Sequence, residues 1–274
     1  MDGPVAVERR GAVGLLRLSR PEVHNAMDAD LLGALADALS SLGADDEIRA
    51  VVLAGSERAF SAGGDLDWIV GHRGGAAVAV NELAGTLHRA VIEIRRMPKP
   101  VIAAVTAVAA GAGMSVALAC DLRVLGRSAR FVLAYPSRGL SVDGGASFSL
   151  PRLVGLARAL EILALDEPIP AERALDWGLA TRVVDDARVV DEALALGGEL
   201  AARSIHAFGI AKRLLVDSFE NTLEDQLELE RAALARCAAH PDGAEGLAAF
   251  REKRPAMFRP RRSLSRRGVS SKPK

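Results

Sequence analysis

The 274-residue chain lacks the residue patterns that identify several large enzyme classes. Its two cysteines, Cys120 and Cys237, do not have metal-ligand spacing, and we expect both to be buried free thiols. No cluster of His, Cys, Asp and Glu predicts a metal site. No Gly-Lys-Ser/Thr phosphate loop occurs, and the glycines at 111 and 113 lack the later acidic residue of a dinucleotide fingerprint. We therefore expect neither a metal nor a redox cofactor.

The chain also lacks the patterns of a secretory signal and of a membrane span. Residues 1–11 are acidic and basic by turns and contain no apolar core, so no signal peptide is predicted. Residues 101–120 carry no charge over the length of a bilayer span. They are mostly Ala, Val and Gly, which favours a buried strand, a tight turn and a buried helix. We expect a cytoplasmic protein without a membrane-spanning segment.

Charge is balanced overall but not along the chain. The formal net charge is zero, yet residues 259–274 hold seven basic side chains and no acidic one. This Ser-, Pro- and Arg-rich tail has no apolar periodicity, and we expect it to be disordered. It is either a solvated extension or a contact for nucleic acid or another anionic surface. We favour the solvated extension and expect no nucleic-acid partner.

Strands and helices alternate over most of the chain, and helices alone follow residue 187. The patterns predict strands at residues 5–10, 13–18, 50–54, 101–105, 122–125 and 130–133. They predict helices at residues 28–42, 76–96, 189–203, 205–219, 222–239 and 244–253. This order is typical of an α/β core with a helical C-terminal subdomain. From periodicity alone, an ordinary doubly wound sheet fits nearly as well.

Two small-residue turns stand out, one around Gly63 and Gly64 and the other at residues 111–113. Each follows an apolar run and precedes an expected helix. A helix start leaves backbone N–H groups unpaired, and glycine lets a ligand approach the backbone closely. Brought together, the two turns would form an oxyanion hole for a carbonyl that gains negative charge.

The same residues resemble the enoyl-CoA hydratase/isomerase (crotonase) family. The resemblance rests on FSAGGDL at 60–66, PKPVIAAV at 98–105, GAG at 111–113, ACDLR at 119–123, LPRLVG at 150–155, ALDWGL at 174–179 and FREKRP at 250–255. It covers roughly residues 5–258 in order and at family spacing, which is more specific than any one motif.

The resemblance implies the fold, the assembly and part of the site. The expected fold is a crotonase-like ββα spiral core at residues 1–200 with a helical trimerisation subdomain at 201–258, followed by the tail at 259–274. The expected assembly is a homotrimer or a dimer of trimers. The N–H groups of Gly64 and Ala112 would form the oxyanion hole, and CoA would be part of an acyl-CoA substrate rather than a cofactor. His24, Ala62, Asp65, Leu66 and Tyr135 would contact that substrate.

The resemblance argues against hydration. Family hydratases activate water with two glutamates, and their positions fall here on Ser115 and Tyr135, which carry no carboxylate. Asp143, in the GLSVDGGAS stretch at 139–147, matches instead the Asp-Gly-Gly stretch of family isomerases, including those acting on phenylacetyl-CoA epoxide. Residues 221–230 resemble the phenylacetate-pathway isomerases as well. One carboxylate can move a proton between carbons of an enolate held in the oxyanion hole.

Several residues have alternative interpretations. Asp143 and Asp65 could each be a helix N-cap. His88 is by default a histidine on a helix face, but together with Asp143 it also matches the aryl-CoA dehalogenases of the family, in which a histidine assists an aspartate nucleophile. Tyr135, the only tyrosine, could orient the substrate or simply form an amphipathic wall. Ser115 lies in a Gly-x-Ser-x-Ala turn that weakly resembles a hydrolase nucleophile elbow.

The sequence thus predicts an acyl-CoA isomerase that acts on an unsaturated or epoxidised thioester. If the protein is a different enzyme of the same family, we expect an enoyl-CoA hydratase or an aryl-CoA dehalogenase. If it is not an enzyme, we expect a homologue that binds acyl-CoA or RNA without catalysis. The two glycine turns favour an enzyme, whereas the absence of the two glutamates leaves a non-catalytic binding protein as an alternative.

Overall fold

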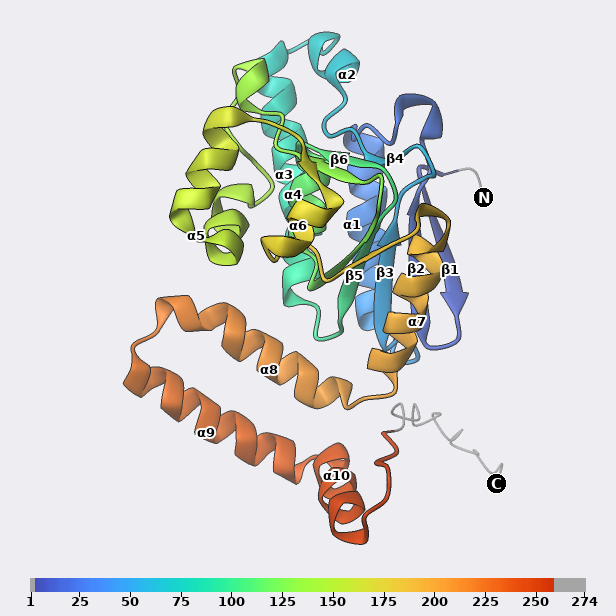
Figure 1. Cartoon of the computed structure of the whole chain (residues 1–274), viewed down its shortest axis with the longest axis vertical. Helices are drawn as coiled ribbons and strands as arrows, with labels where there is room; N and C mark the ends of the chain where they lie inside the picture. Colours follow the sequence, from blue (N-terminus) through green and yellow to red (C-terminus); the bar gives the residue numbers. More distant parts are fainter. Residues whose placement is uncertain (1–2, 259–274) are drawn as a thin grey trace, which may run out of the picture.

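The computed structural model describes residues 3–258, and Figure 1 shows their arrangement. The predicted tail at 259–274 lies outside the described residues. A layered α/β core occupies the upper part of the view, and the last three helices extend below it. The predicted α/β class with C-terminal helices is confirmed.

A six-stranded sheet forms the centre of the core. It has the order β1-β2-β3-β5-β7-β10, with β1 and β2 forming an antiparallel hairpin and all other pairs parallel. Its strands are β1 (Val5–Arg10), β2 (Val13–Leu18), β3 (Ala50–Ala54), β5 (Val101–Val105), β7 (Leu122–Gly126) and β10 (Arg182–Val184).

A second, four-stranded sheet was not foreseen in full from the sequence. Its strands, in spatial order, are β4 (Ala59–Ser61), β6 (Val108–Ala110), β8 (Arg130–Val132) and β9 (Ile169–Pro170). The apolar run that begins at residue 101 therefore gives two strands in two sheets, because the chain turns at Thr106, whose hydroxyl donates to the carbonyl of Ser56 at 2.6 Å.

Successive units of the chain repeat one pattern. Each places a first strand in the large sheet and a second in the small one, and then forms a helix, as in β3–β4, β5–β6 and β7–β8. The helices that follow are α2 (Leu66–Val70) with α3 (Ala76–Arg96), then α4 (Ala112–Ala119), then α5 (Ala146–Leu165) and α6 (Ala171–Asp176). These ββα units are the repeat that the family resemblance implies.

Both faces of the large sheet are buried. Along β3, Val51 and Leu53 enter the main core, whereas Val52 and Ala54 face α7 (Val189–Ala201), because side chains alternate between the faces of a strand. The main core is completed by α1 (Ala29–Ala44), α3 and α4. Asp28 caps the start of α1, because its carboxylate accepts the N–H of Leu31 at 2.9 Å.

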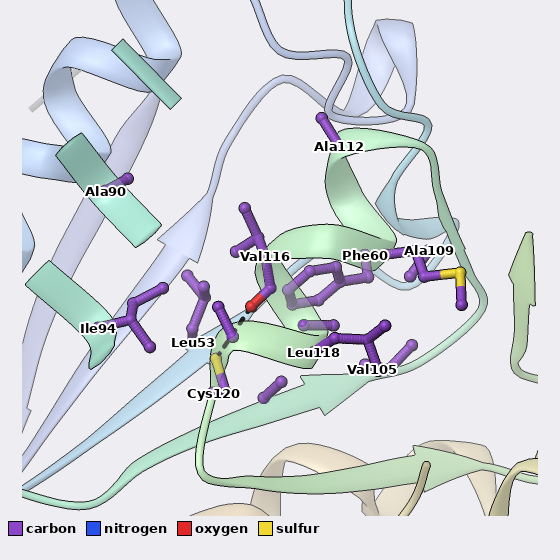
Figure 2. Close-up of a cluster of buried hydrophobic side chains, with 14 of the residues drawn as sticks. Leu53, Phe60, Ala90, Ile94, Val105, Ala109, Ala112, Val116, Leu118 and Cys120 are labelled. Carbon is purple, nitrogen blue, oxygen red and sulfur yellow. Dashed lines mark hydrogen bonds between the residues drawn. The ribbon is translucent and has the colours of Figure 1, made fainter. Parts of the chain in front are cut away.

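Every residue of α4 is buried, and Figure 2 shows Val116, Leu118 and Cys120 among side chains of neighbouring elements. Burial raises the pKa of the Cys120 thiol to about 12, so it is an inert free thiol as predicted. Cys237 is also free but only partly buried, which corrects the expectation for it. Within residues 3–258, no helix has the length and apolar character to cross a bilayer.

The C-terminal helices are α8 (Ile205–Asp217), α9 (Leu223–Ala239) and α10 (Pro241–Glu252). α8 and α9 lie side by side and, with α10, form the lower part of Figure 1, which we call the C-terminal arm. Many of its large apolar side chains are exposed: Leu215, Phe219, Leu223, Leu227, Leu229, Leu234, Leu247 and Phe250.

One buried ion pair attaches this arm to the core. Lys212 of α8 donates to Asp121 Oδ2 at 2.8 Å and to the carbonyl of Ile94 at 2.9 Å. The same carboxylate oxygen accepts the N–H of Val101 at 2.9 Å. Burial raises the pKa of Asp121, and Lys212 opposes that shift by favouring the carboxylate. The pair therefore joins α8 to the end of α3 and the start of β5.

Replacing Lys212 with Met should lower the free energy of unfolding by about 3–5 kcal/mol, because the buried carboxylate then has no counter-charge. The folded-state pKa of Asp121 lies above its unfolded value, so the loss should shrink as the pH falls and the carboxylate is protonated. Urea unfolding over a pH series measures both effects. Arg213→Met, which removes an exposed pair with Asp217, is the control and should cost less than about 1 kcal/mol. A fully stable Lys212→Met variant would contradict this anchoring role.

Candidate active site

The two glycine turns predicted from the sequence lie next to each other. β4 and β6 are parallel neighbours, so the loops that follow them leave the small sheet at the same edge. Gly63 has φ 95° and Gly111 has φ 50°, both in the region that favours glycine. A Cβ on Gly63 would lie 2.9 Å from the carbonyl oxygen of Ala110 and 3.4 Å from the Cα of Gly111. The two backbones can approach this closely only because neither turn has a side chain there.

Two backbone N–H groups remain available at this junction. Among the described residues, neither Gly64 nor Ala112 donates a backbone hydrogen bond, although their neighbours do. Asp65 donates to the carbonyl of Met27 at 3.0 Å, and Gly111 donates to that of Val132 at 3.0 Å. Ala112 is also the first residue of α4, where the helix dipole favours negative charge. The structure thus brings together the two N–H groups that the resemblance assigns to an oxyanion hole.

Polar contacts fix the turn that contains Gly64. Arg20 Nη1 donates to the carbonyl of Ala26 at 2.7 Å and lies 3.0 Å from Asp65 Oδ2 and 2.9 Å from Asp28 Oδ2. The other oxygen of Asp65 accepts the N–H of Trp68 at 3.1 Å, so the predicted capping of the next helix is confirmed. Both oxygens of Asp65 are therefore engaged within the protein, and its contact with substrate stays a prediction.

The other predicted contact residues lie around the same turn. His24 is exposed, and its carbonyl accepts the N–H of Ala62 at 2.9 Å. Ala62 and Leu66, which flank the glycines, are exposed as well, Leu66 by 47%. They form an accessible rim beside Gly64, and their roles in binding substrate stay predictions.

Asp143 is paired with His88 rather than with a helix end. His88 Nε2 lies 2.6 Å from Asp143 Oδ1, and the side chains are 52% and 32% exposed. The cap of α5 is Gly145, and only the backbone carbonyl of Asp143 bonds to that helix, accepting the N–H of Ala146 at 3.2 Å. The capping interpretation of Asp143 is therefore wrong. We call His88 and Asp143 the dyad.

The segment that carries Asp143 is held against α4. Ser115 donates its hydroxyl to the carbonyl of Asp143 at 2.8 Å and lies 3.4 Å from the hydroxyl of Tyr135. Gly144, at φ 61°, leaves no room for a side chain, because a Cβ would lie 2.8 Å from the Cβ of Ser115. Ser115 is three residues after Ala112 on the same face of α4. The dyad is thus placed within about one helical turn of the predicted oxyanion hole.

Ser115 itself does not have the surroundings of a hydrolase nucleophile. Its hydroxyl bonds to the carbonyls of Asp143 and Gly111 and to Tyr135, and no described histidine is a partner. His206 and His240 stack on each other in the C-terminal arm, with ring centroids 3.7 Å apart. The hydrolase interpretation therefore has no support in the geometry.

The sequence reasoning missed the residues that position β4. Asn25 is fully buried, and its side-chain amide donates to the carbonyls of Ala59 and Phe60 at 3.0 and 3.2 Å. Its backbone carbonyl accepts the hydroxyl of Ser61 at 2.8 Å. The left-handed conformation at Asn25, φ 54°, is one that asparagine tolerates better than most residues. An asparagine in a polar loop is the only feature of the local sequence that indicates this role, and such a feature is weak.

Comparisons with known proteins agree with this geometry. The family model described as enoyl-CoA hydratase/isomerase matches residues 8–261. A relative named 1,2-epoxyphenylacetyl-CoA isomerase, from Escherichia coli K12, is 38% identical and covers 89% of this chain and 93% of its own. A relative named 4-chlorobenzoyl coenzyme A dehalogenase-2, from Arthrobacter, is 36% identical over 92% of both chains. A crystal structure titled as an enoyl-CoA hydratase from Polaromonas is 40% identical, with a TM-score of 0.89 over 93% of this chain and 99% of that one.

The ββα units and the paired glycine turns define a crotonase-fold protein. The chain belongs to the enoyl-CoA hydratase/isomerase family, whose enzymes act on acyl-CoA substrates. The family resemblance of the sequence is confirmed, and its relatives include an isomerase, a dehalogenase and probable hydratases.

Burial raises the pKa of Tyr135 to about 12, against an ordinary value near 10. Because Tyr135 is the only tyrosine, ultraviolet absorbance during alkaline titration reports this one group. We expect the folded protein to form little tyrosinate at pH 10 and the urea-unfolded protein, as the control, to titrate normally. Stability should fall as the pH rises above 10, since the unfolded state releases this proton more readily. An ordinary titration in the folded protein would contradict the buried position.

Proposed function

We propose that this protein is an acyl-CoA isomerase that moves a proton on an unsaturated or epoxidised acyl thioester. The observation that carries the proposal is the position of Asp143, whose backbone carbonyl is bonded to the helix that begins at the free N–H of Ala112 and whose carboxylate contacts His88. CoA enters as part of the substrate, and the proposed chemistry needs no further cofactor. The Escherichia coli relative named as an isomerase supports this branch of the family.

In the proposed reaction, the thioester oxygen accepts the N–H groups of Gly64 and Ala112. These donors stabilise the enolate that forms when Asp143 removes a proton from carbon, and they lower the barrier by favouring the charge that develops there. The protonated Asp143 then returns the proton to a different carbon. His88 holds Oδ1 of the same carboxylate, which leaves Oδ2 to face the substrate. We infer that His88 orients the base.

Hydration is disfavoured by the same site. The family glutamates would stand at Ser115 and Tyr135, and Ser115 is hydrogen-bonded to backbone rather than open to a water. Tyr135 keeps its proton at neutral pH, because its pKa is raised to about 12. It can therefore donate a hydrogen bond to the substrate but cannot serve as a base.

A second candidate function follows from the contact between His88 and Asp143. In an aryl-CoA dehalogenase, the carboxylate of Asp143 would attack the ring carbon that bears the halogen and displace it as a halide ion, which gives an aryl ester. His88 would then assist attack of water on this ester, which releases the hydroxylated product and restores the carboxylate. The 2.6 Å contact between the two side chains and the Arthrobacter relatives support this candidate. We rank it second because Tyr135 stands where the family resemblance places a tryptophan in those enzymes.

We also propose that the exposed leucines of the C-terminal arm are covered in a homotrimer or a dimer of trimers. An apolar surface of this extent is rarely left to solvent in a soluble protein. We propose a cytoplasmic location for this assembly.

A turnover screen tests the proposed function. The purified protein is offered enoyl-CoA thioesters, ring-epoxide CoA thioesters and halogenated aryl-CoA thioesters, and isomerisation, hydration and halide release are measured separately. We expect isomerisation of at least one thioester and negligible hydration of crotonyl-CoA. Efficient hydration would show that the acid and base residues are misassigned, and halide release would select the second candidate. Binding of acyl-CoA without any turnover would favour a non-catalytic homologue.

Asp143→Asn should lower kcat for isomerisation by about 10²-fold or more, because the amide cannot accept the proton. Affinity for CoA ligands should change little, so the effect separates chemistry from binding. Steady-state kinetics and calorimetric binding measure the two quantities. The matched control is Asp37→Asn on α1, which removes a surface pair with Arg89 and should leave both unchanged. Normal turnover by a folded Asp143→Asn variant would remove Asp143 from the mechanism.

A further inference from the structure

A cleft of about 440 Å³ lies between α3, α5 and α8. Its apolar wall includes Val91, Phe148 and Val216. Gly145, two residues after Asp143, lines it too, and a Cβ on Gly145 would lie 3.7 Å from Val91. The cleft therefore begins where the segment that carries the base meets α3. Its volume suits an acyl group rather than a whole CoA thioester.

The cleft contains a cation that forms no ion pair among the described residues. Arg95 of α3 lines it and is partly buried, and its guanidinium carbon lies 5.9 Å from the centre of the Phe148 ring. Its charge acts on the buried carboxylate of Asp121 only at longer range, where it opposes the raised pKa of that group. Two acidic residues line the cleft as well: Asp217 pairs with Arg213, and Glu220 forms no ion pair in the described part of the chain. A partly buried guanidinium without an ion pair favours an anionic ligand.

Two more donors line the same cleft. Ser149 is 8% exposed, and its hydroxyl has no hydrogen-bond partner among the described residues. Lys212 is 7% exposed and uses two of its three N–H groups, on Asp121 and on the carbonyl of Ile94. Arg95, Ser149 and Lys212 thus have spare donors at one cleft. A carboxylate, which accepts several hydrogen bonds at once, matches this set.

The direction of the cleft connects it with the reaction. α3 and α4 run in the same direction, because they are connected at two successive places. Gly144 lies between Leu87 of α3 and Ser115 of α4, and Lys212 bonds to both Ile94 of α3 and Asp121 after α4. Along this direction, the N–H of Ala112 comes first, the dyad second and Arg95 last. Arg95 is seven residues after His88, about 10.5 Å along the helix axis. An acyl chain that starts at the oxyanion hole and passes the dyad would extend into the cleft toward Arg95.

We propose that the substrate's acyl group carries a second carboxylate at its far end, and that Arg95 binds this carboxylate together with Ser149 and Lys212. This proposal rests on the proposed function for the position of the thioester. It specifies the substrate class, an ω-carboxylated acyl-CoA, and it assigns Arg95 as the specificity-determining residue. The apolar wall would contact the chain between the two ends.

Binding of two unreactive ligands tests the proposal without turnover. The ligands are saturated acyl-CoA thioesters of equal chain length, long enough to pass the dyad, one ending in a methyl group and the other in a carboxylate. By calorimetry, the wild-type protein should bind the carboxylate-terminated ligand about tenfold more tightly or better, because charge-assisted hydrogen bonds replace water. Arg95→Gln should abolish that preference and leave the affinity for the methyl-terminated ligand unchanged. Equal affinities in the wild type would overturn the proposal.

Two further variants test whether the preference depends on Arg95 and its neighbour Ser149. Arg89→Gln, on the same helix but paired with Asp37, should keep the full preference. Ser149→Ala, a small change that leaves the charge intact, should reduce the preference and provides the test should Arg95→Gln fail to fold. Preference that survives both Arg95→Gln and Ser149→Ala would overturn the proposal. A preference lost in these variants, in a protein that isomerises no thioester, would support the carboxylate site and contradict only the proposed function.

Discussion

The candidate site depends on the close parallel pairing of two very short strands. β4 and β6 end side by side, and the glycines that follow them let the two backbones approach within van der Waals contact. A side chain on Gly63 would separate the turns and move apart the segments that carry the N–H groups of Gly64 and Ala112. The buried amide of Asn25 holds β4, and the guanidinium of Arg20 holds Asp65 in the turn that follows it. Since both donors are backbone groups, the fold of the two turns, and not the identity of a side chain, determines where these donors lie.

Asp143, the proposed acid–base residue, is positioned differently, because the backbone that follows it packs against a helix. Gly144 fits between α3 and α4 only without a side chain, and Ser115 fixes the carbonyl of Asp143. The serine at the position of a family glutamate thus has a structural role, because it fixes the backbone of the segment that carries Asp143. The carboxylate of that residue is held separately, by its contact with His88.

Much of this structure could be predicted from the sequence, and the exceptions have physical reasons. The 21-residue helix α3 has clear periodicity and the strand β3 is a continuous apolar run, and both agree with their predicted bounds. β4 and β6 have three residues each, too few for a pattern, and pairing with each other defines them more than their composition does. The contact of His88 with Asp143 joins positions 55 residues apart, which no local signal encodes. The family motif located the carboxylate, whereas only the folded chain showed its partner.

The different environments of the two cysteines determine where oxidants and alkylating reagents act. Such reagents need a thiolate, and Cys120 is enclosed in the core with its pKa raised to about 12. Cys237 is free and only partly buried on α9, far along the chain from the glycine turns. Covalent damage would therefore begin on the C-terminal arm, and a single label attached at Cys237 would report on the arm's surroundings while the catalytic core stays unmodified.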